Sequence, residues 1–157
     1  MQREHGSEWR SRVGAMLVVL QLGLMAALAA LAAPAFIGGN AGAGAWFLAL
    51  AGAALGSWAV SANRPGNFNI RPTPREGGRL VQEGPYRWIR HPMYSAVIVL
   101  GAAAAWATLG WQAWLALAAL AAVLAGKAAL EERWMLAVHP GYRAYRARTK
   151  RFVPGIW

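Results

Sequence analysis

Charged residues are absent from two long parts of this chain. No lysine, arginine, aspartate or glutamate occurs at 13–63 or at 91–126. Uncharged apolar runs of about 20 residues are typical of membrane-spanning helices. Only 14 % of the 157 residues are charged, against about a quarter in soluble domains. The sequence therefore predicts an all-α fold, a polytopic membrane helix bundle with about four transmembrane helices. The predicted spans are 13–33, 44–62, 93–109 and 111–127.

The basic residues predict how this bundle crosses the membrane. All 16 lie before the first span, between the second and third, or from the end of the fourth onward. By the positive-inside rule, both termini and the long middle loop are then cytoplasmic. Topology and anionic lipid headgroups account for the net charge of +10, so we expect membrane lipids rather than nucleic acid as partners. The Ala- and Arg-rich composition is typical of bacteria, which indicates an inner-membrane protein.

The first apolar run has a second interpretation. Arg10 and Arg12 precede it and small residues end it near Ala33, as in a secretory signal peptide. However, the run is longer than the usual apolar core of about 7–15 residues. Its removal would also leave an odd number of spans. We therefore expect the first span to be retained.

The chain is expected to form one integral membrane domain over residues 1–157. Residues 13–62 would be scaffold spans, 63–92 a cytoplasmic loop, and 93–157 a hairpin and cofactor-binding half. Gly52 and Gly56, like Gly101 and Ala105, are spaced as small residues at close helix contacts. Packing within the chain is the favoured interpretation, although a dimer contact would use the same pattern. The oligomeric state stays open.

Two motifs flank the second pair of spans. Arg90-His91-Pro92-Met93-Tyr94 precedes it, and Glu131-Glu132 follows it. At about 1.5 Å per residue, 93–130 would form roughly 57 Å of helix, or two arms of about 28 Å if the chain turns at Gly110-Trp111. Each arm approaches the roughly 30 Å thickness of a bilayer core. A hairpin of this length would bring both motifs to the same, cytoplasmic, membrane face.

The run from Gly84 to Tyr94 (Gly-Pro-Tyr-Arg-Trp-Ile-Arg-His-Pro-Met-Tyr) resembles the signature of the isoprenylcysteine carboxyl methyltransferases. Phospholipid N-methyltransferases carry a looser version. The second half of that signature is similar to Glu131-Glu132, the run from His139 to Tyr145, and the ending with Pro154. This resemblance covers about 79–157 and implies an integral membrane enzyme that uses S-adenosylmethionine. It also implies that the C-terminal half holds this cofactor.

The resemblance implies a cofactor site of seven residues: Tyr86, His91, Pro92, Tyr94, Glu131, Glu132 and Tyr142. A carboxylate can accept both ribose hydroxyls of the cofactor. Adjacent helical residues point about 100° apart, so we expect one glutamate to face the cofactor and the other an arginine or a backbone amide. Solvated glutamates, a helix cap at His91 and an interfacial anchor at Tyr142 are the simpler alternatives.

Methyl transfer depends mainly on alignment of the reactants and exclusion of water. A carboxylate acceptor needs a group to orient it, whereas an amine must also lose a proton. Arg90 is the predicted catalytic residue, orienting a lipophilic or lipid-linked acceptor whose identity the sequence leaves open. No metal is expected, because His91 and His139 have no evident third ligand and the chain contains no cysteine.

Two other functions compete with methyl transfer. Membrane sterol reductases have a similar Arg-His-Pro-x-Tyr motif and use NADPH, but they favour Gly-Asp where this chain has Ser95-Ala96. A non-catalytic scaffold would use the basic surface only to bind headgroups.

Overall fold

The computed structural model describes the backbone of residues 2–63 and 80–156, and the side chains from residue 12 within these ranges. The helices are α1 (Gln2–Ile37), α2 (Ala43–Asn63), the 3-10 helix η1 (Gly84–Arg87), α3 (Pro92–Thr108), α4 (Trp111–Val138) and α5 (Tyr142–Arg148). The prediction of an all-α membrane helix bundle is confirmed. Residues 64–79 of the cytoplasmic loop expected at 63–92 lie outside the described residues.

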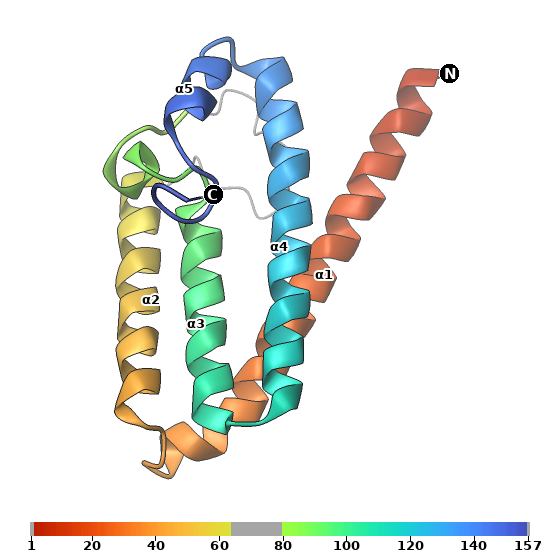
Figure 1. Ribbon diagram of the computed structural model, residues 1–157. Coiled ribbons are helices and arrows are strands. Elements are labelled where there is room, and N and C mark those ends of the chain that lie inside the picture. Colours follow the sequence, from red (N-terminus) through yellow and green to blue (C-terminus); the bar gives the residue numbers. More distant parts are fainter. Residues whose placement is uncertain (1, 64–79, 157) are drawn as a thin grey trace.

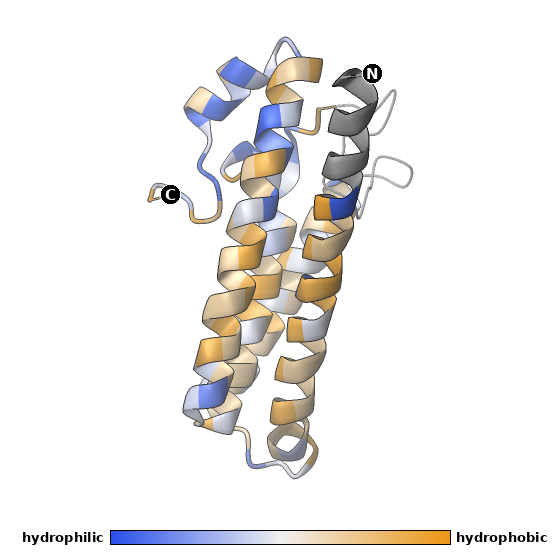
Figure 2. Ribbon diagram, turned by 90° about the vertical axis from the view of Figure 1, so that its right-hand side faces the viewer, coloured by the Kyte–Doolittle hydropathy of each residue, from blue (hydrophilic) through white to orange (hydrophobic). Residues whose placement is uncertain are grey.

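Four helices form the bundle, and the shorter elements lie at one end of it (Figure 1). Helix α3 packs against α1, α2 and α4, and α1 also packs against α4. Helix α1 crosses α4 at an angle and leans away toward its N-terminal end. η1, α5 and the C-terminal segment lie at the end of the bundle where α3 begins and α4 ends. Figure 2 shows apolar residues along the bundle and hydrophilic residues concentrated at this end.

Three of the described helical segments are long and apolar enough to cross a membrane: Arg12–Ile37, Ala43–Asn63 and Trp111–Val138. The fourth, α3, is apolar but has only 17 residues. Helix α1 extends beyond the predicted 13–33 and ends where Gly39 adopts a left-handed backbone with a φ of 70°. Helix α4 continues past residue 127 to Val138, so its last turns reach the hydrophilic end of the bundle.

Small residues let the helices approach closely inside the chain. A Cβ placed on Gly52 would lie 2.8 Å from Cγ of Leu100, and one on Gly101 would lie 2.9 Å from Cδ1 of Leu117. Both glycines therefore serve packing within the chain, the interpretation that the sequence favoured. This packing holds α3 against its neighbours and fixes the position of the residues at its N-terminal end.

The hairpin turns where the sequence predicted. Helix α3 ends at Thr108, Leu109 adopts a left-handed backbone with a φ of 53°, and α4 begins at Trp111 after Gly110. The two helices then run side by side (Figure 1). As a result, the start of α3 and the end of α4 lie at the same end of the bundle.

Candidate functional site

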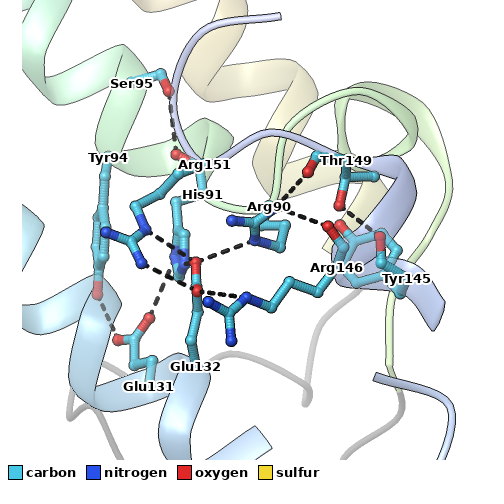
Figure 3. Close-up of polar contacts among 10 residues, drawn as sticks. All are labelled: Arg90, His91, Tyr94, Ser95, Glu131, Glu132, Tyr145, Arg146, Thr149 and Arg151. Atoms are coloured by element: carbon cyan, nitrogen blue, oxygen red, sulfur yellow. Dashed lines mark hydrogen bonds and ion pairs between the residues drawn. The ribbon is translucent and has the colours of Figure 1, made fainter. Parts of the chain in front are cut away.

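Charged side chains from three parts of the sequence meet where α3 begins (Figure 3). Arg90 and His91 come from the segment before α3, Glu131 and Glu132 from the last turns of α4, and Arg151 from the C-terminal segment. The predicted meeting of the Arg-His-Pro motif and the glutamate pair is therefore what the structure shows.

Backbone pairing holds the C-terminal segment against this site. The N–H of Arg90 donates to the carbonyl of Lys150 at 2.8 Å, and the N–H of His91 donates to the carbonyl of Arg151 at 3.1 Å. Ile89 and Lys150 form an isolated parallel bridge. The hydroxyl of Ser95, in the first turn of α3, donates to the carbonyl of Phe152 at 2.7 Å. These bonds place the side chain of Arg151 next to that of Arg90.

Glu132 is the centre of the charge cluster, and its side chain is only 3 % exposed. Its carboxylate accepts hydrogen bonds from Nε of Arg90 at 3.0 Å, and from Nε and a terminal nitrogen of Arg151 at 3.0 and 3.1 Å. Arg146 and His91 add contacts at 3.5 and 3.3 Å. Burying a carboxylate is tolerable only when it is paired and hydrogen-bonded, and these contacts meet that condition.

Arg90 links three parts of the fold. Besides its bond to Glu132, its guanidinium donates to the backbone carbonyls of Arg146 and Thr149. It therefore joins the end of α5 to the end of α4. Its expected role in orienting the acceptor stays a prediction.

Glu131 makes a different set of contacts from its neighbour. Its carboxylate accepts a hydrogen bond from the hydroxyl of Tyr94 at 2.5 Å and lies 3.4 Å from Nδ1 of His91. Its side chain is 22 % exposed. The two glutamates thus face different partners, as their angular separation on a helix requires. Glu132 faces arginines, which leaves Glu131 as the more accessible carboxylate.

His91 lies between the two carboxylates. One ring nitrogen faces Glu131 and the other faces Glu132, at 3.4 and 3.3 Å. Burial alone would lower the pKa of His91, but the hydrogen bonds to both glutamates outweigh it and raise the pKa above its ordinary value. The imidazole also stacks on the ring of Tyr94, with centroids 5.4 Å apart. His91, predicted to bind the cofactor, is the N-cap residue of α3 and connects the two glutamates, and its contact with a cofactor stays a prediction.

The other predicted residues surround this cluster. Pro92 is buried as the first residue of α3. Tyr86 accepts the hydroxyl of Tyr145 on its backbone carbonyl at 2.8 Å, and burial with the nearby charge of Glu131 raises the pKa of Tyr86 to about 12. Tyr142 is buried and packs against Tyr145, with ring centroids 5.8 Å apart. Whether these residues hold a cofactor stays a prediction.

Sequence reasoning missed four residues of this region: Gln21, Lys127, Arg146 and Arg151. The two arginines had no distinguishing signal, since seven basic residues follow position 126. Lys127 had none either, because a basic residue at the cytoplasmic end of an apolar span is common, and only the structure shows that it is buried. No group of three or more potential metal ligands from histidine, cysteine, aspartate or glutamate occurs among the described residues.

Comparison with known proteins identifies the family. A model of the isoprenylcysteine carboxyl methyltransferase family matches residues 45–138. This range includes the Arg-His-Pro motif and both glutamates. No curated protein and no solved structure matches the chain. Because the family match covers more than half of its residues, this integral membrane protein belongs to the isoprenylcysteine carboxyl methyltransferase family.

Proposed function

We propose that this protein methylates a lipophilic acceptor at the cytoplasmic face of the membrane, with S-adenosylmethionine as its cofactor. The observation that carries the proposal is the difference in burial and contacts between two adjacent glutamates. Glu132 is enclosed by arginines, whereas Glu131 is partly exposed and oriented by Tyr94 and His91. Family membership supports a methyltransferase rather than a reductase or a scaffold.

The donors and acceptors of the site fit the chemical groups of this cofactor. The Glu131 carboxylate would accept hydrogen bonds from the ribose hydroxyls. Arg146, whose side chain is 47 % exposed beside Glu132, would attract the carboxylate of the amino acid part. When bound, S-adenosylmethionine supplies an electrophilic methyl group on a positively charged sulfur.

The charge of the site supports an anionic acceptor over a protonated amine. Arg90, Arg146 and Arg151 surround Glu132, and the Lys127 ammonium lies 5.1 Å from the centre of the Tyr94 ring. Together with the two carboxylates, these four cations leave a net charge of +2 before any charge on His91. A carboxylate of the isoprenylcysteine type is therefore the favoured acceptor, and a lipid amine is the second candidate. Arg90 would orient the carboxylate without a general base.

The distribution of basic residues along the chain supports a membrane orientation. We infer that the hydrophilic end of the bundle faces the cytoplasm of a bacterial cell, with the protein in the inner membrane and both termini inside. Exposed arginines of α5, including Arg143 and Arg148, would contact anionic lipid headgroups rather than nucleic acid.

Calorimetric binding to the detergent-purified protein tests the cofactor. S-adenosylhomocysteine, the demethylated product, should bind the parent with saturation, and NADPH should not. Glu131→Gln should weaken this binding at least tenfold, because a charge-assisted bond is worth about 1.5–3 kcal/mol. Glu83→Gln is the matched control, since Glu83 lies exposed on the loop before η1. A protein that binds NADPH but not S-adenosylhomocysteine would refute the proposal.

Transfer of a radiolabelled methyl group tests the acceptor. A prenylated N-acetylcysteine and phosphatidylethanolamine would be supplied separately in mixed micelles. We expect base-labile label, typical of a methyl ester, on the carboxylic acid. Label found only on the amine would still support methyl transfer as the function, but it would exclude a carboxylate acceptor.

A further inference from the structure

A lysine is buried inside the bundle one helical turn before Glu131. Lys127 lies in α4 and is 2 % exposed, the largest of the fully buried side chains. A charged side chain within a membrane span costs several kcal/mol, by an amount that depends on its surroundings. The predicted site does not include this residue, and the proposed reaction uses only its positive charge, so the position of Lys127 inside the bundle requires a further explanation.

Gln21 and Tyr94 both contact the Lys127 ammonium. It donates a hydrogen bond of 2.7 Å to the side-chain oxygen of Gln21 in α1. It also lies over the ring of Tyr94 in α3, 5.1 Å from the ring centroid. A cation in this position is attracted by the electrons of the ring face, most strongly where water is excluded. Lys127 therefore connects three helices.

Tyr94 in turn contacts the residues of the candidate site. Its hydroxyl donates to the Glu131 carboxylate at 2.5 Å, and its ring stacks on His91. The positive charge beside the ring also strengthens the phenol as a donor, because it stabilises negative charge on the phenol oxygen. A continuous path thus runs from Gln21 through Lys127 and Tyr94 to Glu131.

We propose that Lys127 is a positioning residue that holds Tyr94, and through it Glu131, in the orientation that binds the cofactor. Gln21 supports it from α1, which lies outside the family-matched residues 45–138. This inference rests on the proposed function, because it takes Glu131 as the carboxylate that contacts the cofactor. It adds a contribution of the first span to the site.

Calorimetric binding of S-adenosylhomocysteine to the full-length protein tests this inference. Lys127→Met should weaken binding about tenfold and Gln21→Leu about threefold, in line with a desolvated cation–π contact and one hydrogen bond. Lys150→Met and Gln112→Leu are matched controls on exposed side chains and should leave binding unchanged. Unfolding midpoints measured on each variant identify any variant that fails to fold.

A double-mutant comparison separates positioning from a general structural role. In a Tyr94→Phe background the path to Glu131 is already cut, so Lys127→Met should then change binding by less than twofold. A merely structural lysine would instead give effects that multiply. Multiplying effects, or a Lys127→Met variant that binds like the parent while Glu131→Gln does not, would overturn the inference and leave the proposed function intact. A parent that binds no S-adenosylhomocysteine would overturn both.

Discussion

Replacing Glu132 by glutamine should destabilise the protein far more than the same replacement at Glu131. Glu132 is the shared partner of Arg90 and Arg151, with three hydrogen bonds of 3.0–3.1 Å to these two residues. Glutamine would keep one acceptor oxygen but point its amide nitrogen at a guanidinium. Removing one partner of a buried ion pair costs about 3–5 kcal/mol. Because half of the acceptor capacity survives, we expect a loss of about 3 kcal/mol in the free energy of unfolding.

Glu131→Gln is the internal control for this change. The glutamine oxygen can still accept the hydroxyl of Tyr94, and the side chain is partly exposed. The lost contact is the one to His91, at 3.4 Å. A single hydrogen bond contributes about 0.5–1.5 kcal/mol, so we expect a loss of about 1 kcal/mol. Helix propensity cancels from the comparison, because the two substitutions are identical and adjacent.

Titration with sodium dodecyl sulfate in dodecyl maltoside micelles, followed by tryptophan fluorescence, would measure both variants. The expected difference in the free energy of unfolding is about 2 kcal/mol, with Glu132→Gln the less stable. Equal losses would show that the arginines around Glu132 contribute no net stability. A larger loss for Glu131→Gln would refute the assignment of the structural role to Glu132.

Three shorter predictions concern pH, packing and topology. The pKa of His91 is raised in the folded protein, so protonation of His91 stabilises the fold. This stabilisation is complete below the unfolded pKa of about 6.5 and is lost as pH rises through the folded pKa. In unfolding titrations, His91→Gln should abolish the decrease in stability with rising pH. Gly52→Ala should lower the free energy of unfolding by about 1–3 kcal/mol, because its Cβ would overlap the facing leucine, whereas Gly56→Ala meets ordinary contact at 3.5 Å and should be tolerated in the same assay. The chain has no cysteine, so an impermeant thiol reagent applied to intact cells should label Asn40→Cys and leave Arg148→Cys unlabelled; the reverse would invert the topology.

The hairpin could be predicted from the sequence because its determinants are local. An apolar run with a break at Gly110 specifies two helices and a turn between them, and the length of the run specifies where they return. The pair Pro140-Gly141 likewise explains why α4 stops at Val138. The meeting of Arg90 with the glutamates followed from these lengths, without knowledge of side-chain packing.

The partners of each glutamate could not be predicted in the same way. Arg151 reaches Glu132 because the C-terminal segment pairs with the chain before α3 over only a few backbone bonds. Such a short pairing leaves no periodic pattern in the sequence. Several arginines follow α4, and the sequence does not distinguish which of them reaches Glu132, because that depends on the path of the backbone. The burial of Lys127 was not predictable either, because its partner Gln21 lies in a distant span and only the packing of the helices brings the two side chains together.

The adjacency of Glu131 and Glu132 explains how one helix end can serve two purposes. Side chains about 100° apart cannot both enter the arginine cluster, so burial of Glu132 turns Glu131 toward Tyr94 and His91. The buried face of α4, which includes Leu120 and Leu124, fixes the rotation of the helix, and that rotation directs Glu132 to the arginines and Glu131 to Tyr94 and His91. Inserting one alanine between the two glutamates would leave Glu131 and Lys127 in place, because Leu120, Leu124 and Ala128 are fully buried and hold that part of α4 in the bundle. The insertion would instead turn Glu132 by about 100° away from its arginines. Such a variant should lose at least as much stability as Glu132→Gln in the same unfolding titration, because these arginines would no longer meet a carboxylate.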